Sequence, residues 1–212
     1  DRVFFVDDDI RHGVELWFSD GTSAGTRIVR DIVSGTGGSF PFYLTAVGDR
    51  LFFGAGNRDL SDSGGLDLWV SDGTAQGTVV LTALVPGRTG NVGSLTAAGD
   101  RLFFSLADVD RGEELWVSDG TAEGTAFVKD IYPGPGGSEP SRHSFPVATD
   151  DSVFFGATDP EHGDELWVSD GTAEGTQLLC EVVPGTGGSS PEHFRVAGVT
   201  GPLEPGDRAL AE

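Results

Sequence analysis

One short block does most to limit what this chain can fold into: Glu-Leu-Trp, two further residues, and Asp-Gly-Thr. It occurs four times, with Asp67 replacing the leading Glu once. The tryptophans of the blocks are spaced 52, 47 and 51 residues apart and are the only ones in the chain: Trp17, Trp69, Trp116 and Trp167. A period of about 40 to 50 residues is typical of repeat proteins, in which one unit cannot bury its apolar face alone. The chain is therefore expected to stack four similar modules.

Each repeat contains four short segments that favour β-strands. In the third repeat they are residues 94–98, 101–105, 114–118 and 126–131. A Gly-Asp pair joins the first two segments as a two-residue hairpin turn, and aromatic and β-branched residues favour strands in the others. No segment shows a helical apolar period long enough for a buried helix. The sequence therefore predicts an all-β fold.

Four antiparallel strands in series, repeated four times, predict a four-bladed β-propeller. The first strand of each repeat is short and rich in small residues, which suits the crowded axis. The second carries a Phe-Phe pair, whose rings face opposite sides of a sheet. The expected blades are residues 1–32 with 193–199, 42–84, 93–131 and 143–183, and residues 200–212 form a tail.

The end of the chain predicts how such a ring closes. Residues 193–198 resemble a further first strand, so we expect them to pair with Val3–Phe5 and remove the free edge of the first blade. The alternative is a four-repeat piece of a longer array or a larger ring, since such repeats propagate readily. Residues 206–210 faintly resemble the start of a fifth repeat.

The charge of the chain excludes some partners. Thirteen basic and 34 acidic residues give a net charge of −21, which repels phosphate backbones and anionic membranes. We therefore expect no nucleic-acid partner, and no membrane insertion because no apolar run approaches about 18 residues. The acidic excess fits either a solvated surface or cation binding. The single cysteine, Cys180, forms no internal disulfide.

The four blocks resemble the motif of bacterial ELWxxDGT-repeat proteins, and the likeness covers residues 1 to about 198. This resemblance implies a secreted or surface-exposed bacterial protein, usually a long repeat array, whose signal segment is not present in this chain. The Ser-Asp-Gly-Thr turns are also similar to the Asp-box of sialidases and other propellers. They are shorter, and no aromatic residue closes them, so they imply no hydrolase activity.

Two repeated sets of residues are interpreted as structural. Aspartate in the turn after the third strand can accept backbone N–H groups while the next Gly takes a left-handed conformation; this set is Asp20, Asp72, Asp119 and Asp170. The four tryptophans are expected to fill the wedge between neighbouring blades. A sugar-stacking platform is the alternative for the tryptophans.

The loops between the second and third strands are candidate metal sites. Three of the four share Asp, three residues, Gly, one residue and Glu, and carboxylates around a tight turn suit Ca²⁺, which takes six to eight oxygen ligands. The candidate ligands are Asp9, Glu15, Asp108, Asp110, Glu114, Asp159, Glu161 and Glu165. The alternative is a set of solvated acidic loops whose Glu pairs with nearby basic groups.

No catalytic motif occurs: there is no Gly-x-Ser-x-Gly elbow, His-Glu-x-x-His or phosphate loop. The loops between second and third strands should share one face with the Gly-rich connections between repeats, and binding sites commonly lie on such loops. We therefore expect a non-enzymatic, extracellular binding or scaffold module with a protein or glycan partner, either alone or as part of a larger repeat protein or assembly. The alternatives are a calcium-dependent lectin and a sialidase-like hydrolase.

Overall fold

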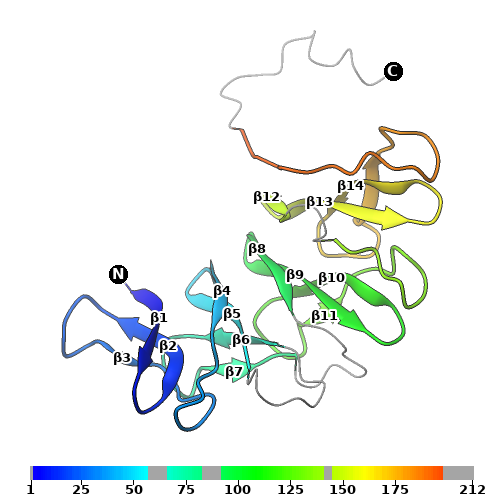
Figure 1. The fold of residues 1–212 in the computed structure, drawn as a ribbon. Coiled ribbons are helices and arrows are strands. Elements are labelled where there is room, and N and C mark those ends of the chain that lie inside the picture. Colours follow the sequence, from blue (N-terminus) through cyan, green and yellow to red (C-terminus); the bar gives the residue numbers. More distant parts are fainter. Residues whose placement is uncertain (1, 57–65, 83–91, 141–144, 198–212) are drawn as a thin grey trace.

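A computed structural model describes residues 2–56, 66–82, 92–140 and 145–197 (Figure 1). Within these residues all regular secondary structure is β-strand, arranged in four antiparallel sheets, and no helix long and apolar enough to cross a membrane is present. The strands are β1 (Val3–Asp9), β2 (Gly13–Ser19), β3 (Arg27–Ile28), β4 (Phe42–Val47), β5 (Arg50–Ala55), β6 (Asp67–Ser71), β7 (Val79–Val80), β8 (Gly93–Ala98), β9 (Arg101–Asp108), β10 (Gly112–Ser118), β11 (Ala126–Phe127), β12 (Val147–Thr149), β13 (Ser152–Asp159), β14 (Gly163–Ser169) and β15 (Gln177–Cys180).

Each sheet is one sequence repeat, with its strands paired in chain order. The orders are β1-β2-β3, β4-β5-β6-β7, β8-β9-β10-β11 and β12-β13-β14-β15. The Phe-Phe pair aligns with the tryptophan block in the same register each time; Phe53 pairs with Trp69 and Phe104 with Trp116. The predicted all-β fold with repeated antiparallel sheets is confirmed.

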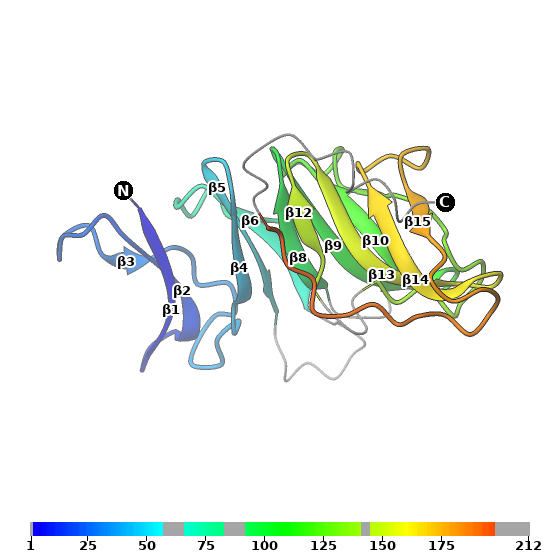
Figure 2. The same ribbon diagram turned by 90° about the horizontal axis from the view of Figure 1, so that it is seen from above.

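The core consists of three hydrophobic clusters, one at each junction between neighbouring sheets. The two rings of a Phe-Phe pair enter different clusters: Phe53 packs toward the first sheet and Phe52 toward the third. This follows from the alternation of side chains along a strand. Figures 1 and 2 show the four sheets following one another along an arc, and their inner strands β4, β8 and β12 contact one another in that order.

The predicted ring closure is wrong. Among the described residues the first sheet has three strands, and no strand pairs with the free edge of β1. Residues 193–197 form no strand; instead Phe194–Ala197 lie beside Val147, Thr149 and Phe154 of the fourth sheet. Figure 1 shows this segment at the opposite end of the arc from β1. Each sheet buries a face on the next sheet of the arc, and no hydrophobic cluster of the described residues joins the last sheet to the first. Residues 198 and 199 lie outside the described residues.

Candidate functional site

Two kinds of loop form the predicted loop face. One is the turn after the Phe-Phe strand (β1–β2, β9–β10 and β13–β14), and the other is the Gly-rich connection between consecutive sheets. In the first repeat, the backbone N–H groups of Ser39 and Phe40 donate to the carbonyl of Val14 at 2.9 and 3.1 Å. Gly13 has φ +66°, and a Cβ on it would lie 2.6 Å from the carbonyl oxygen of Thr36, so only glycine allows this approach. Gly112 and Gly163 occupy equivalent positions. The connections are therefore packed against the turns.

The leading aspartate of each described turn holds the turn itself. Asp9 Oδ1 accepts the backbone N–H groups of Arg11 and His12, and its carboxylate lies 2.8 Å from His12 Nδ1. This hydrogen bond with His12 is the main reason that the pKa of Asp9 is lowered to about 2, and it raises the pKa of His12. The remaining two turns repeat the arrangement, Asp108 with Arg111 and Asp159 with His162.

The glutamate of each block is buried and clamps the connection to its sheet. Glu114 accepts the backbone N–H groups of Tyr132 and Ser138 at 3.0 and 3.1 Å, and the Ser138 hydroxyl at 2.5 Å. Burial raises the pKa of Glu114 to about 7, although these hydrogen bonds act in the opposite direction. Glu15 accepts the backbone N–H of Val33 and the hydroxyl of Ser39, and burial raises its pKa as well.

The last clamp differs electrostatically from the other two. Glu165 accepts the Ser189 hydroxyl and the backbone N–H groups of Val182 and Val183. Burial raises its pKa, but these hydrogen bonds outweigh that effect, so the pKa of Glu165 is lowered overall. Glu165 is as fully buried as Glu15 and Glu114, but it belongs to the last sheet of the described chain, where less surrounding protein adds to the desolvation.

These contacts separate the predicted calcium ligands from one another. Asp9, Asp108 and Asp159 cap turns, while Glu15, Glu114 and Glu165 point into the clamps. Asp110 and Glu161 donate their backbone N–H groups to the carboxylates of Asp108 and Asp159. Within the described ranges, no group of three His, Cys, Asp or Glu side chains could hold a metal ion. The described carboxylates therefore do not fit a calcium site, and the second-repeat loop with Asp59 and Asp62 lies outside the described residues. Calcium binding stays a prediction.

The Asp-Gly-Thr turns use their polar groups in the same way in all four repeats. Asp119 Oδ1 accepts the backbone N–H and the hydroxyl of Thr121 at 2.8 and 2.7 Å, and the Thr121 hydroxyl accepts the N–H of Gly124. Threonine is the largest cause of the lowered pKa of Asp119. The same bonds surround Asp20, Asp72 and Asp170. A second Gly, at Gly124 and its equivalents, leaves room for the carboxylate; a Cβ there would overlap it. The sequence analysis missed this role.

Three of the tryptophans lie at the sheet junctions. Trp116 and Trp167 are each 7% exposed within the clusters, and Trp69 packs against the cluster between the first two sheets. Trp17 is half-buried and stacks on Phe5 with ring centroids 6.3 Å apart. Trp17 belongs to none of the three clusters, because no sheet precedes the first one in the described chain.

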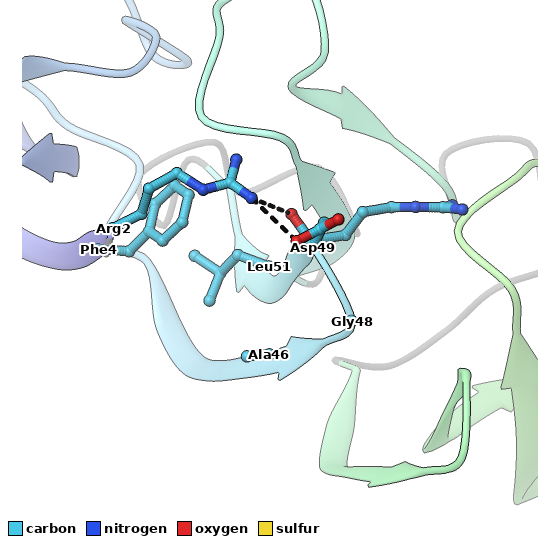
Figure 3. A pocket seen from close by; sticks show the side chains of 7 residues that line it. Arg2, Phe4, Ala46, Gly48, Asp49 and Leu51 are labelled. Carbon is cyan, nitrogen blue, oxygen red and sulfur yellow. Dashed lines mark hydrogen bonds and ion pairs between the residues drawn. The ribbon is translucent and has the colours of Figure 1, made fainter. Parts of the chain in front are cut away.

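Two pockets in the described chain lie at the β4–β5 turn, a position that was not predicted from the sequence. Figure 3 shows one of them. One, of about 330 Å³, is lined by Arg2, Phe4 and Asp49 among others. Arg2 donates to the carbonyl of Asp72 at 3.1 Å and to Asp49 Oδ1 at 3.3 Å. Arg50 donates to the carbonyl of Asp119 at 2.7 Å. Each arginine thus ties its sheet to the Asp-Gly-Thr turn of the next. The sequence contains a sign of this contact, because an Asp-Arg pair recurs just before the Phe-Phe strand, at Arg2, Arg50 and Arg101.

Comparison with solved structures supports the architecture. The chain is similar to puromycin hydrolase, with 11% identity and a TM-score of 0.50, over 84% of this chain and 26% of that one. Other matches are the acylaminoacyl peptidase of Pyrococcus horikoshii (12% identity, TM-score 0.49, 84% and 25% covered) and the β-propeller domain of the Trilobed protease from Pyrococcus furiosus (15%, 0.49, 86% and 52%). No protein-family model and no curated protein matches the chain. The fold is therefore propeller-like, and the chain spans about a quarter of the length of the hydrolase.

This comparison corrects the predicted function. We expected an extracellular, non-enzymatic binding or scaffold module, with a calcium-dependent lectin and a sialidase-like hydrolase as the alternatives. The fold is instead similar to that of a puromycin hydrolase, and the match covers 26% of that chain. The prediction of a binding or scaffold module is therefore wrong.

Proposed function

We propose that the chain is a non-catalytic propeller-type segment of a hydrolase-related protein, built from ELWxxDGT-type repeats. One observation carries the non-catalytic part. The groups best suited to acid–base or nucleophilic chemistry, the buried glutamates and their serines, make the same fold-holding bonds in the three repeats where they occur. An active site is normally a single constellation, whereas these pairs recur with the period of the sequence.

The hydrolase context of the proposal comes from the puromycin hydrolase, whose name states its activity and whose fold is shared over 84% of this chain. In this proposal the repeats supply a rigid body and another part of the protein supplies the chemistry. An extracellular location and a protein or glycan partner stay predictions.

A substrate panel tests the non-catalytic part. Purified chain should release no chromophore from aminoacyl p-nitroanilides or p-nitrophenyl esters above the buffer rate. Turnover that disappears in Ser39→Ala, Ser138→Ala or Ser189→Ala would contradict the proposal, because these hydroxyls lie beside the buried glutamates. An exposed serine, as in Ser23→Ala, provides the matched control.

The hydrolase context needs a separate measurement. An antibody raised against this chain should precipitate from its source cells a longer polypeptide that carries hydrolase activity, identified by mass spectrometry of its peptides. A precipitated polypeptide without such activity would overturn this part and leave the non-catalytic assignment intact.

A further inference from the structure

Two half-exposed aromatic rings meet where the inner strands of two sheets begin. Tyr43 lies in β4 and is 41% exposed, and Phe145 lies just before β12 and is 57% exposed. Their ring centroids are 5.9 Å apart, and the ring planes are inclined by 71°. The two residues occupy equivalent positions in the second and fourth sheets. The rings therefore bridge these sheets, whose inner strands β4 and β12 both contact β8 (Figure 1).

A bulge in β4 re-aims the side chain of Tyr43. The register of β4 with β5 shifts between Phe42 and Thr45, and Tyr43 has φ +56°, which residues with a side chain rarely adopt. Bulges commonly redirect a side chain next to a functional site. The third sheet has the same bulge, but its equivalent residue is the small, buried Ser94, with φ +52°. The bulge alone therefore does not require an exposed aromatic residue.

Phe42 anchors the ring of Tyr43 to the core. The two ring centroids are 4.6 Å apart, and Phe42 packs against the hydrophobic cluster between the second and third sheets. The ring of Phe42 lies so close to Gly54 that a Cβ on this glycine would be 2.8 Å from it. A ring held in this way loses little conformational freedom when a ligand binds, which favours affinity.

The angle between the two exposed rings favours a compact cationic ligand. Planes inclined by 71° form a corner, whereas a sugar ring stacks on a flat aromatic surface. Aromatic rings attract ammonium and guanidinium groups, and cages of several rings recognise such cations. The chain already forms contacts of this kind: the Arg27 guanidinium lies 4.5 Å from the ring centroid of Phe18, and that of Arg111 lies 4.7 Å from Phe127.

The charge of the chain favours the same ligand. Its net charge of −21 attracts cations, whereas a neutral apolar group or sugar gains nothing from this field. We propose that Tyr43 and Phe145, the aromatic corner, bind an arginine or lysine side chain in a basic segment of a second polypeptide. This inference goes beyond the proposed function, because it concerns binding by the segment itself and is independent of the hydrolase context.

Calorimetric titration with a matched pair of peptides tests the proposal. One peptide alternates arginine with glycine, and the other carries citrulline, the uncharged counterpart of arginine, at the same positions. The arginine peptide should bind saturably and the citrulline peptide much more weakly. Tyr43→Leu and Phe145→Leu should each weaken binding of the arginine peptide about fivefold, because leucine keeps an apolar side chain but lacks the aromatic face.

The variants separate the aromatic corner from general attraction to an acidic surface, because they retain the net charge of −21. Tyr43→Phe keeps the ring and should retain binding. Tyr132→Leu changes the other tyrosine of the chain and is the matched control, which should bind as wild type.

Nuclear magnetic resonance of the arginine peptide tests the contact without changing the protein. Its side-chain protons should shift upfield when wild-type protein is added, because they lie over aromatic faces. An arginine peptide that does not bind, equal binding of the citrulline peptide, or wild-type affinity in both leucine variants would overturn the proposal. Binding of cellohexaose in place of the arginine peptide would also overturn it, because the aromatic corner would then be a glycan site.

Discussion

The carboxylate of Asp119 occupies the space that a side chain on Gly124 would need. Gly124 donates to Thr121, which in turn donates to Asp119, so the turn closes around the aspartate. The same pair recurs as Asp20 with Gly25, Asp72 with Gly77, and Asp170 with Gly175. The Asp-Gly-Thr turn of each repeat is therefore a structural turn that ends the third strand and leads into the fourth.

Gly124→Ala should destabilise the protein by about 2 kcal/mol, because a Cβ displaces Asp119 and breaks its two hydrogen bonds with Thr121. Urea unfolding followed by tryptophan fluorescence measures the change. Gly187→Ala is the control, since the nearest atom to its Cβ would be Val183 Cγ1 at 3.9 Å. Equal loss in both variants would show that the aspartate contact is unimportant.

The tryptophans should differ in their contribution to stability according to the junction they fill. Trp116→Ala should cost about 3 to 5 kcal/mol, as expected for a large side chain removed from a core. Trp17→Ala should cost much less in dilute, monomeric protein, because Trp17 lies outside the three clusters. Thermal unfolding by calorimetry compares the two, and a similar loss would mean that Trp17 is buried within a single copy.

Glu114 should make stability fall as the pH rises. Its folded pKa of about 7 lies above the ordinary value of 4.5, so the folded state binds more protons between these values. The contribution is present below about pH 4.5 and is lost as the pH approaches and passes 7, by roughly 3 kcal/mol. In Glu114→Gln this loss should be absent from urea unfolding curves measured at several pH values.

The control for this titration is Glu123→Gln, which changes an exposed glutamate of the neighbouring turn and should retain the wild-type slope. The histidines act in the same direction as Glu114: the raised pKa values of His12 and His162 give stability that is complete below 6.5 and lost at higher pH. A Glu114→Gln slope equal to wild type would place the effect in these histidines or in Glu15, whose pKa is also raised.

His12 should titrate above 6.5 because of Asp9. Asp9→Asn removes the negative partner of the Nδ1 hydrogen bond and should lower the pKa of His12, while His162, paired with Asp159, should not change. Two-dimensional NMR of the imidazole protons follows both residues in one sample. An unchanged His12 would contradict the assigned contact.

The internal repeat was sufficient to predict most of the fold. The Phe-Phe pair, the hairpin turn and the shared loop face follow from alternation and turn chemistry that act within one repeat. Ring closure did not follow. Residues 193–198 have the sequence of an inner strand. The sheet with which such a strand pairs depends on the angle between sheets, and no local sequence pattern encodes that angle.

The role of the block glutamates in holding the connections has a local cause that the sequence does contain. Glu114 and Trp116 are two residues apart on one strand, so they point to the same side of the sheet, and a buried tryptophan implies a buried glutamate. The clamp partner, Ser138, comes 24 residues later and recurs as Ser39 and Ser189 at the same separation. The clamp could therefore have been inferred, whereas the raised pKa of Glu114 required the packed structure.

Hydrogen–deuterium exchange tests most directly the central claim, that within the described part of this chain no inner strand pairs with β1. In dilute protein, peptides covering Val3–Asp9 should exchange much faster than peptides covering Arg50–Ala55, the equivalent strand with an inner partner. Equal, slow exchange of both strands at high dilution would contradict the account, because it would show that the ring closes within one chain.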